Sequence, residues 1–271
     1  MTGDVAAAAA GSGGGCHLFS GCGFPAPGLQ DFNFKPLFVI GSFSFTKPEL
    51  VAILCAIIVV VFFLAALTNP KVVPGKMQSL AELGILAVRD QISRPAMGRK
   101  GDKYLGLLIS LFFFIFMANI MELIPLFQFP AMSRIGFVIP LAITVYVVYL
   151  YLGFKNQGAW GYVSNMWPRG VPWPIYIILI PVELLRFFFI QPFTLGIRLF
   201  ANMFAGHLLL AIFMVATWYL AGLGIGLLFA AGSAVMVVFV FLLELLVDLL
   251  QAFIFTTLTA TYIAASLEAQ H

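Results

Sequence analysis

The sequence predicts an all-α polytopic membrane protein with about five membrane helices, the last two forming a long, steeply tilted antiparallel hairpin, plus an amphipathic helix at the cytoplasmic surface. Of the 271 residues, 62% are hydrophobic and only 9% are charged, so a soluble globule would expose a large apolar surface. Apolar runs recur at bilayer length, and the basic residues gather mainly in one loop. The expected solvent is therefore the lipid bilayer.

The formal net charge of +3 is small and forms no basic stripe with interleaved aromatic residues. We therefore expect no nucleic-acid partner. Residues 1–47 are rich in Gly, Ala and Pro and lack the basic start and cleavage site of a signal peptide. Cys16 and Cys22 either form a disulfide in this tail or remain two free thiols, and Cys55 is expected to be a small core residue.

The first span is expected near residues 48–68, where Glu49 to Thr68 has the length of one bilayer crossing before Asn69-Pro70 ends the helix. The loop 69–103 carries seven Lys and Arg residues and only three acidic residues. The positive-inside rule places this loop in the cytoplasm. Residues 1–47 are then an extracytoplasmic tail, and residues 48–271 form the membrane domain.

Within the cytoplasmic loop, the stretch MQSLAELGILAVRDQI places Leu80, Leu83 and Ala87 on one side of a helix. It predicts an amphipathic helix on the inner membrane surface, and a solvated loop helix is the alternative. Further spans are expected near residues 104–125 and 135–154. Lys155 and Arg169 then mark a second cytoplasmic loop.

The last hundred residues predict two antiparallel helices, near 173–221 and 226–268, joined at the glycine-rich stretch AGLGIG. A straight helix from Trp173 to Leu220 would measure roughly 72 Å against a hydrocarbon core of ~30 Å. A turn at Gln191-Pro192 would leave backbone groups unsatisfied in lipid, so we expect a tilted, partly kinked helix. The C-terminus then lies in the cytoplasm, and no internal repeat is evident.

Ionisable residues at bilayer depth are costly, so each is a candidate for function. Apart from Arg186, the intramembrane polar residues that we take as candidates are Glu122, Glu183, Arg198, His207, Glu244 and Asp248, with Asn119, Asn202 and Gln251 as neutral companions.

Sequence distances from a turn near residue 225 place Arg198 level with Gln251, and His207 level with Glu244, each to within about one residue. Each pair is expected to meet across the two helices as a polar rung, in which a donor or base faces a fitting partner. At ~100° per residue, Glu244, Asp248 and Gln251 form one polar stripe. Arg198 and Asn202 share a face, whereas His207 lies half a turn away and ~13 Å along the helix. Ala201 and Ala205 have a spacing that lets another helix approach closely beside the arginine.

The segments IRLFANMFAGH, LLQAFIFTTLTATYIA and PVELL resemble subunit a of rotary F-type ATP synthases, from the first span to the C-terminus. The resemblance implies that Arg198 faces a rotating ring of c subunits, and that Asn202 and Gln251 match family positions. His207 and Glu244 exchange the acid and imidazole of many bacterial members, as mitochondrial members do. Asp248 matches no family position that we can assign.

The family function implied is that of a stator subunit conducting protons through two offset half-channels to and from the ring carboxylates. His207, Glu244, Glu122, Asn119 and Asp248 would carry protons in from the outer surface, because imidazole and carboxylate titrate near working pH.

Glu183 would line the exit to the cytoplasm. Arg198 would attract the ring carboxylate and repel leaking protons, a task for a side chain that stays charged.

The resemblance also implies partners and a location. These are the c-subunit ring, b-type peripheral stalk subunits, the rest of the ATP synthase complex, protons and a bacterial plasma membrane. No cofactor or metal is expected, and the chain is not expected to be catalytic alone.

Structural alternatives accompany each candidate. Arg198 could extend to the membrane surface, Arg186 is expected to pair with Glu183, and His207 could make only an interhelical hydrogen bond. Asp248 and Glu122 could merely hydrate or brace neighbouring helices. A secondary ion-coupled transporter is the alternative function, but it usually has repeat symmetry and broken helices. An intramembrane enzyme would need a nucleophile or metal ligands that the sequence does not offer.

Overall fold

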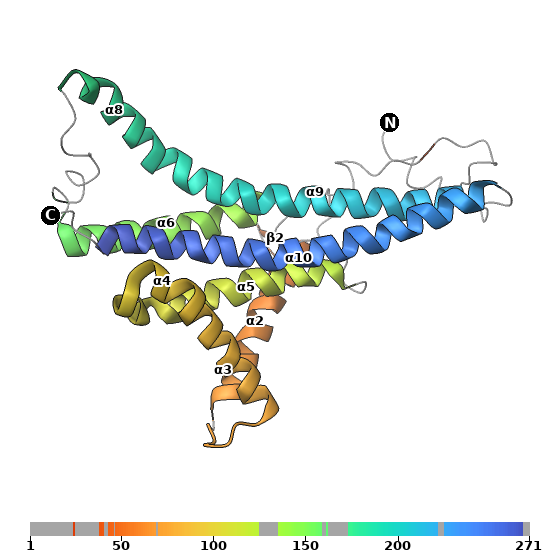
Figure 1. Ribbon diagram of the computed structural model, residues 1–271, viewed down its shortest axis with the longest axis horizontal. Helices are drawn as coiled ribbons and strands as arrows, with labels where there is room; N and C mark the ends of the chain where they lie inside the picture. Colours follow the sequence, from red (N-terminus) through yellow and green to blue (C-terminus); the bar gives the residue numbers. More distant parts are fainter. Residues whose placement is uncertain are drawn as a thin grey trace.

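The computed structural model describes residues 24, 38–40, 43–45, 47–68, 70–124, 135–158, 161, 173–221 and 225–267. These residues are almost entirely helical, and five helical stretches are long and apolar enough to cross a membrane. The predicted fold class is thereby confirmed. Figure 1 shows an elongated bundle in which the last two long helices, α9 and α10, lie side by side along most of their length.

A short β-hairpin precedes the first long helix, and the sequence analysis did not anticipate it. Strands β1 (Phe38–Ile40) and β2 (Phe43–Phe45) pair in antiparallel register, with Phe38 opposite Phe45. Phenylalanine and β-branched residues favour such pairing. Cys16 and Cys22 lie outside the described residues, so their pairing stays open.

The first long helix, α2 (Lys47–Leu67), leads through a short connection into a chain of helical segments. These segments are α3 (Lys76–Val88), the π-helix η3 (Arg89–Ser93), α4 (Arg94–Met97) and the 3₁₀-helix η4 (Gly98–Tyr104). Gly98 has φ of 62°, a conformation that glycine adopts without steric cost. The chain can therefore change direction there before the next membrane helix.

Helix α3 packs inward through a face of small and polar residues rather than through its leucines. Gln78, Ala81 and Val88 are buried, whereas Leu80 and Leu83 are 61% and 67% exposed. The exposed leucines form an apolar edge available to lipid. This geometry suits the predicted amphipathic surface helix.

Helices α5 (Leu105–Leu123) and α6 (Ile135–Gln157) are the next two long apolar elements. Ile124 is extended, with φ of −81° and ψ of 117°, because Pro125 disfavours helical backbone in the residue before it. Gly158 follows α6 with φ of 73°, and its backbone N–H donates to the Phe154 carbonyl at 3.0 Å. Both helix ends therefore have a local sequence cause.

The stretch from Trp173 to Leu220 is continuous and bent. It consists of α8 (Trp173–Leu185), the π-helix η6 (Arg186–Ile190) and α9 (Gln191–Leu220). Pro192 has no backbone N–H and its ring crowds the preceding turn, so the helix widens just before it. Figure 1 shows α8 leaving the bundle beyond this point.

The final helix, α10 (Ile225–Leu267), is the centre of the bundle and packs against α5, α6 and α9. Ala252, Phe255 and Ile263 are at most 1% exposed and form part of the main core. The 43 residues of α10 make it about 65 Å long. It fits a ~30 Å hydrocarbon layer only if it is tilted roughly 60° from the membrane normal.

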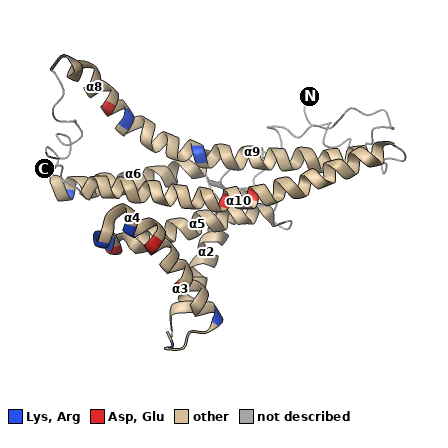
Figure 2. Ribbon diagram, in the orientation of Figure 1, with Lys and Arg blue, Asp and Glu red and all other residues tan. Residues whose placement is uncertain are grey.

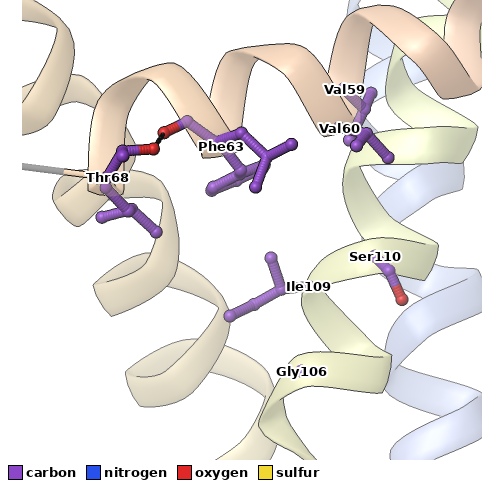
Figure 3. A pocket seen from close by; sticks show the side chains of 9 residues that line it. Val59, Val60, Phe63, Thr68, Gly106, Ile109 and Ser110 are labelled. Atoms are coloured by element: carbon purple, nitrogen blue, oxygen red, sulfur yellow. Dashed lines mark hydrogen bonds between the residues drawn. The ribbon is translucent and has the colours of Figure 1, made fainter.

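An open cleft of about 420 Å³ separates part of α2 from α5 (Figure 3). Its walls include Val60, Phe63 and Ile109, with the small residues Gly106 and Ser110 on the α5 side. The described residues that line it carry no charged side chain. The cleft is therefore suited to apolar contact and not to proton chemistry.

Candidate functional site

Three polar side chains of α10 are buried on one face of the helix. Glu244 is 5% exposed, Asp248 is fully buried and Gln251 is 5% exposed. Their spacing of four and three residues places them one above another along the helix. The predicted polar stripe therefore points into the bundle. Figure 2 shows how few charged residues accompany it along the long helices.

Helix α5 supplies a polar partner to this stripe. Asn119 is fully buried, and its Nδ2 atom donates a hydrogen bond to the backbone carbonyl of Asp248 at 3.4 Å. The two residues are 129 positions apart in sequence. The contact brings two of the predicted site residues together and ties α5 to the polar level of α10.

Glu244 faces a glycine of α9. A Cβ atom built on Gly206 would lie 2.1 Å from Glu244 Oε1, so the carboxylate occupies space that any larger residue would fill. His207 is the next residue and is half-buried. Nearer the turn, Ser233 Oγ donates to the Phe213 carbonyl at 3.0 Å. These contacts place residues 206 and 207 of α9 beside Glu244 of α10, as expected for a turn near residue 225.

Arg198 lies on the other side of α9. It is exposed, as are Ala201 and Ala205, while Leu199 and Met203 on the opposite side are at most 1% exposed. The arginine therefore shares its outer face with the two small residues. Asn202, half-buried, lies between the two faces.

The predicted pairing of Arg198 with Gln251 is not found. No hydrogen bond joins the two side chains, both of which the structure describes, because Gln251 points into the bundle and Arg198 points out. The two side chains therefore take different directions from the hairpin. The arginine is exposed on the outer face of α9.

Glu183 and Arg186 form the predicted ion pair at the end of α8, confirming this contact. The glutamate side chain is 19% exposed and the arginine 55% exposed. Glu183 therefore lies near the bend, well separated along the chain from the buried acids of α10. Glu122 is in the last turn of α5, and its side chain lies outside the described residues.

Tyrosines between α6, η6 and α10 were missed by the sequence analysis. Tyr149 is 2% exposed, and its ring centroid lies 5.6 Å from that of Tyr262 and 5.8 Å from that of Phe187. Tyr262 is within electrostatic reach of both Arg198 and Arg186. A buried tyrosine hydroxyl usually forms a hydrogen bond. Tyrosines within the apolar runs of the sequence could therefore have indicated these polar positions.

Among the residues that the structure describes, no group of three or more His, Cys, Asp or Glu side chains is placed to hold a metal ion. The arrangement instead offers buried carboxylates, an imidazole and a separate exposed guanidinium. The carboxylates and the imidazole can take up, hold and release protons, whereas the guanidinium stays protonated.

Comparison with known proteins gives one consistent family. The family model described as ATP synthase A chain matches residues 50–264. An ATP synthase subunit a from Streptomyces lividans is 43% identical over 261 residues, covering 94% of this chain and 92% of that protein. Another from Rhodococcus erythropolis is 37% identical over 253 residues, covering 91% of each chain. A third, from Hyphomonas neptunium, is 39% identical and covers 83% of this chain and 88% of that protein.

Proposed function

This chain belongs to the ATP synthase subunit a family, and from that premise we propose that it is the stator subunit conducting protons to and from the carboxylates of a c-subunit ring. It is a multi-pass component of the bacterial ATP synthase membrane sector, and it serves ATP synthesis and proton transport. The proton path consists of two half-channels, one to each membrane surface, offset from each other along the ring.

One observation carries the proposal: the two acids of α10 lie inside the bundle, whereas the central arginine of α9 lies on its outer face. Within the described residues, no carboxylate forms an ion pair with Arg198, whereas Arg186 has Glu183. A cation at bilayer depth costs at least ~2.5–3.5 kcal/mol. An anion on a neighbouring subunit would remove that cost.

The acids of α10 suit an entry path from the outer surface. Glu244 and Asp248 are one helical turn apart in an apolar interior, so two negative charges there repel each other strongly. A proton shared between them relieves the repulsion. His207 and Asn119 border this pair on α9 and α5, and Glu122 belongs to the same path by family resemblance.

Arg198 separates the two half-channels. Its guanidinium stays protonated, attracts a ring carboxylate that has released its proton and repels protons that would cross directly. Ala201 and Ala205 let a ring helix approach the same face closely. A leak past this point would dissipate ~2.3 kcal/mol per proton for each 100 mV of membrane potential.

The exit path is assigned to the bent end of the same helix. Glu183 lies near the bend at η6, and the ring of Tyr149 packs against Phe187 of η6 and against Tyr262 of α10. Water and hydroxyl groups together can carry a proton along these tyrosines to Glu183. Asn202 and Gln251 complete the polar lining on α9 and α10.

The remaining assignments follow from the family and the basic loop. We place the N-terminus outside, the loop 69–103 and the C-terminus in the cytoplasm, and b-type peripheral stalk subunits against this chain. The chain has no catalytic role alone, since the acids serve proton transfer and not bond-making in a substrate. The other subunits of the complex synthesise ATP.

Replacement of the exposed arginine tests the proposal. In inverted vesicles carrying the assembled complex, Arg198→Ala should abolish ATP-driven proton pumping, while the detached soluble head hydrolyses ATP at its normal rate. Arg89→Ala is the matched control and should keep most pumping, because that arginine lies in the loop 69–103, away from the assigned path, and pairs with the exposed Asp90. Normal pumping by Arg198→Ala would contradict the assignment.

A further inference from the structure

A basic cleft lies where the start of one long helix and the ends of two others come together. It has a volume of about 440 Å³ and is lined by Arg99, Lys100, Lys103, Tyr104, Asn156 and Leu267. These residues belong to η4, the end of α6 and the end of α10, and α5 starts directly after Tyr104. Figure 2 shows basic residues gathered near α4, beside this region.

The three cations of the cleft have no acidic partner among the described residues. The nearest acid in sequence, Asp102, pairs with Arg94 at 3.8 Å and does not line the cleft. Lys103 makes only a cation–π contact, its Nζ lying 5.9 Å from the Tyr104 ring. The cleft therefore presents cationic side chains toward solvent.

The helix ends do not neutralise these charges. The C-termini of α6 and α10 contribute about half a negative charge each, or about one in total. Among the described residues, three full positive charges and the N-terminus of α5 outweigh this, so the side chains and helix ends described there leave a net positive charge of about two. The cleft is thus suited to an anion and not merely to the stabilisation of two helix dipoles.

The segment that carries the cations is held in place. A Cβ on the buried Gly101 would lie 2.5 Å from Ser93 Oγ and 3.0 Å from the Ser93 carbonyl oxygen. Helix η4 therefore packs closely on η3, with no room for a larger residue. Arg99 and Lys103 flank this contact and approach the cleft from a fixed backbone.

A ligand in this cleft would also contact apolar side chains. Leu267 and the Tyr104 ring line the cleft, and the apolar surface of α5 begins at the next residue, Leu105. A ligand with a phosphate group and an attached hydrocarbon chain would use both parts. Free phosphate would use only the charged part.

We propose that this cleft binds the phosphate-bearing head group of an anionic phospholipid, anchoring the ends of α5, α6 and α10 at the membrane surface. Basic pockets between membrane helices recognise such head groups through charge. The site is independent of the proton path, so a failure of either proposal leaves the other standing.

Photo-crosslinking tests the site in the assembled complex. The purified complex in mild detergent is given a limiting amount of phosphatidylglycerol with a photoreactive acyl chain, and adducts are mapped by mass spectrometry. We expect adducts near Tyr104 and Asn156. Lys100→Gln/Lys103→Gln should lower them about 30-fold, since each lysine near a membrane surface contributes roughly a fivefold factor.

Matched variants and probes distinguish the other outcomes. Lys71→Gln/Lys76→Gln removes equal charge from the same loop outside the cleft and should keep full labelling, and Lys100→Arg/Lys103→Arg should keep most of it. Equal labelling by a phosphatidylcholine probe, or an equal loss in the Lys71/Lys76 variant, would overturn the proposal. Suppression by inorganic phosphate beyond that of chloride at equal ionic strength would assign the cleft to free phosphate instead.

Discussion

Gly206 offers a direct test of the contact between α9 and α10. A Cβ there would lie 2.1 Å from Glu244 Oε1, whereas ordinary contact begins near 3.4 Å, so the carboxylate must retreat by about 1.3 Å. Gly→Ala in a helix gains about 1 kcal/mol of propensity, and overpacking costs about 1–3 kcal/mol. The expected net effect on folding is small, but the relay geometry changes.

We expect Gly206→Ala to lower ATP-driven proton pumping in inverted vesicles roughly tenfold to hundredfold, because a displacement of about 1 Å can cost that much in a positioned reaction. Pumping is followed by the quenching of a pH-sensitive dye. Gly232→Ala in α10 is the control, since nothing lies within 4 Å of its added Cβ, and it should pump normally.

A second-site change sharpens the test. Glu244→Asp shortens the acid by about 1.5 Å, which is the retreat that an alanine at position 206 requires. Gly206→Ala combined with Glu244→Asp should therefore pump better than Gly206→Ala alone. Wild-type pumping by Gly206→Ala would refute the inference that proton transfer requires the Glu244 carboxylate in its position beside Gly206. Failure of the double variant to recover pumping would refute it as well.

Three further predictions concern the buried acids and the surface helix. Exchanging His207 and Glu244 together should retain more pumping than either single replacement, measured as a double-mutant cycle; equal damage in all three variants would argue against pairing. Asp248→Asn keeps the backbone carbonyl that accepts the α5 hydrogen bond, so the complex should assemble while pumping falls at least tenfold; unchanged pumping would reduce Asp248 to a bracing role. On α3, Ala81→Leu should destabilise the chain by about 1–3 kcal/mol in thermal unfolding, whereas the apolar replacement Leu83→Met should leave the unfolding temperature nearly unchanged, because only the alanine is buried.

Hydropathy alone could predict the number of long helices, because each apolar run is limited by the same bilayer thickness. It could also predict the bend near Pro192, since a proline inside a helix removes a hydrogen bond wherever it occurs. The π-helical form of that bend was not predicted. It depends on which hydrogen bonds the backbone carbonyls form in the turn before the proline. The residue types in that turn do not distinguish a π-helical pattern from other kinks.

The inward face of α3 could not be read from its pattern either. Its leucines predict an apolar side, and in a soluble protein that side would pack inward. In a membrane protein lipid accepts the leucines, so the small residue Ala81 can occupy the close contact instead. Periodicity identifies two faces of such a helix, but the solvent decides which one is buried.

The same ambiguity explains why the positions of His207 and Glu244 lie together, whereas Arg198 and Gln251 do not pair. Counting from the turn fixes how far along the hairpin a residue lies, and this put Glu244 beside Gly206 and His207. It does not fix direction, because α10 packs against α4, α5, α6 and α9, and α9 also has an exposed face that carries Arg198. Arg198 lies on that exposed face, where we propose that an anion of a neighbouring subunit supplies its counter-charge.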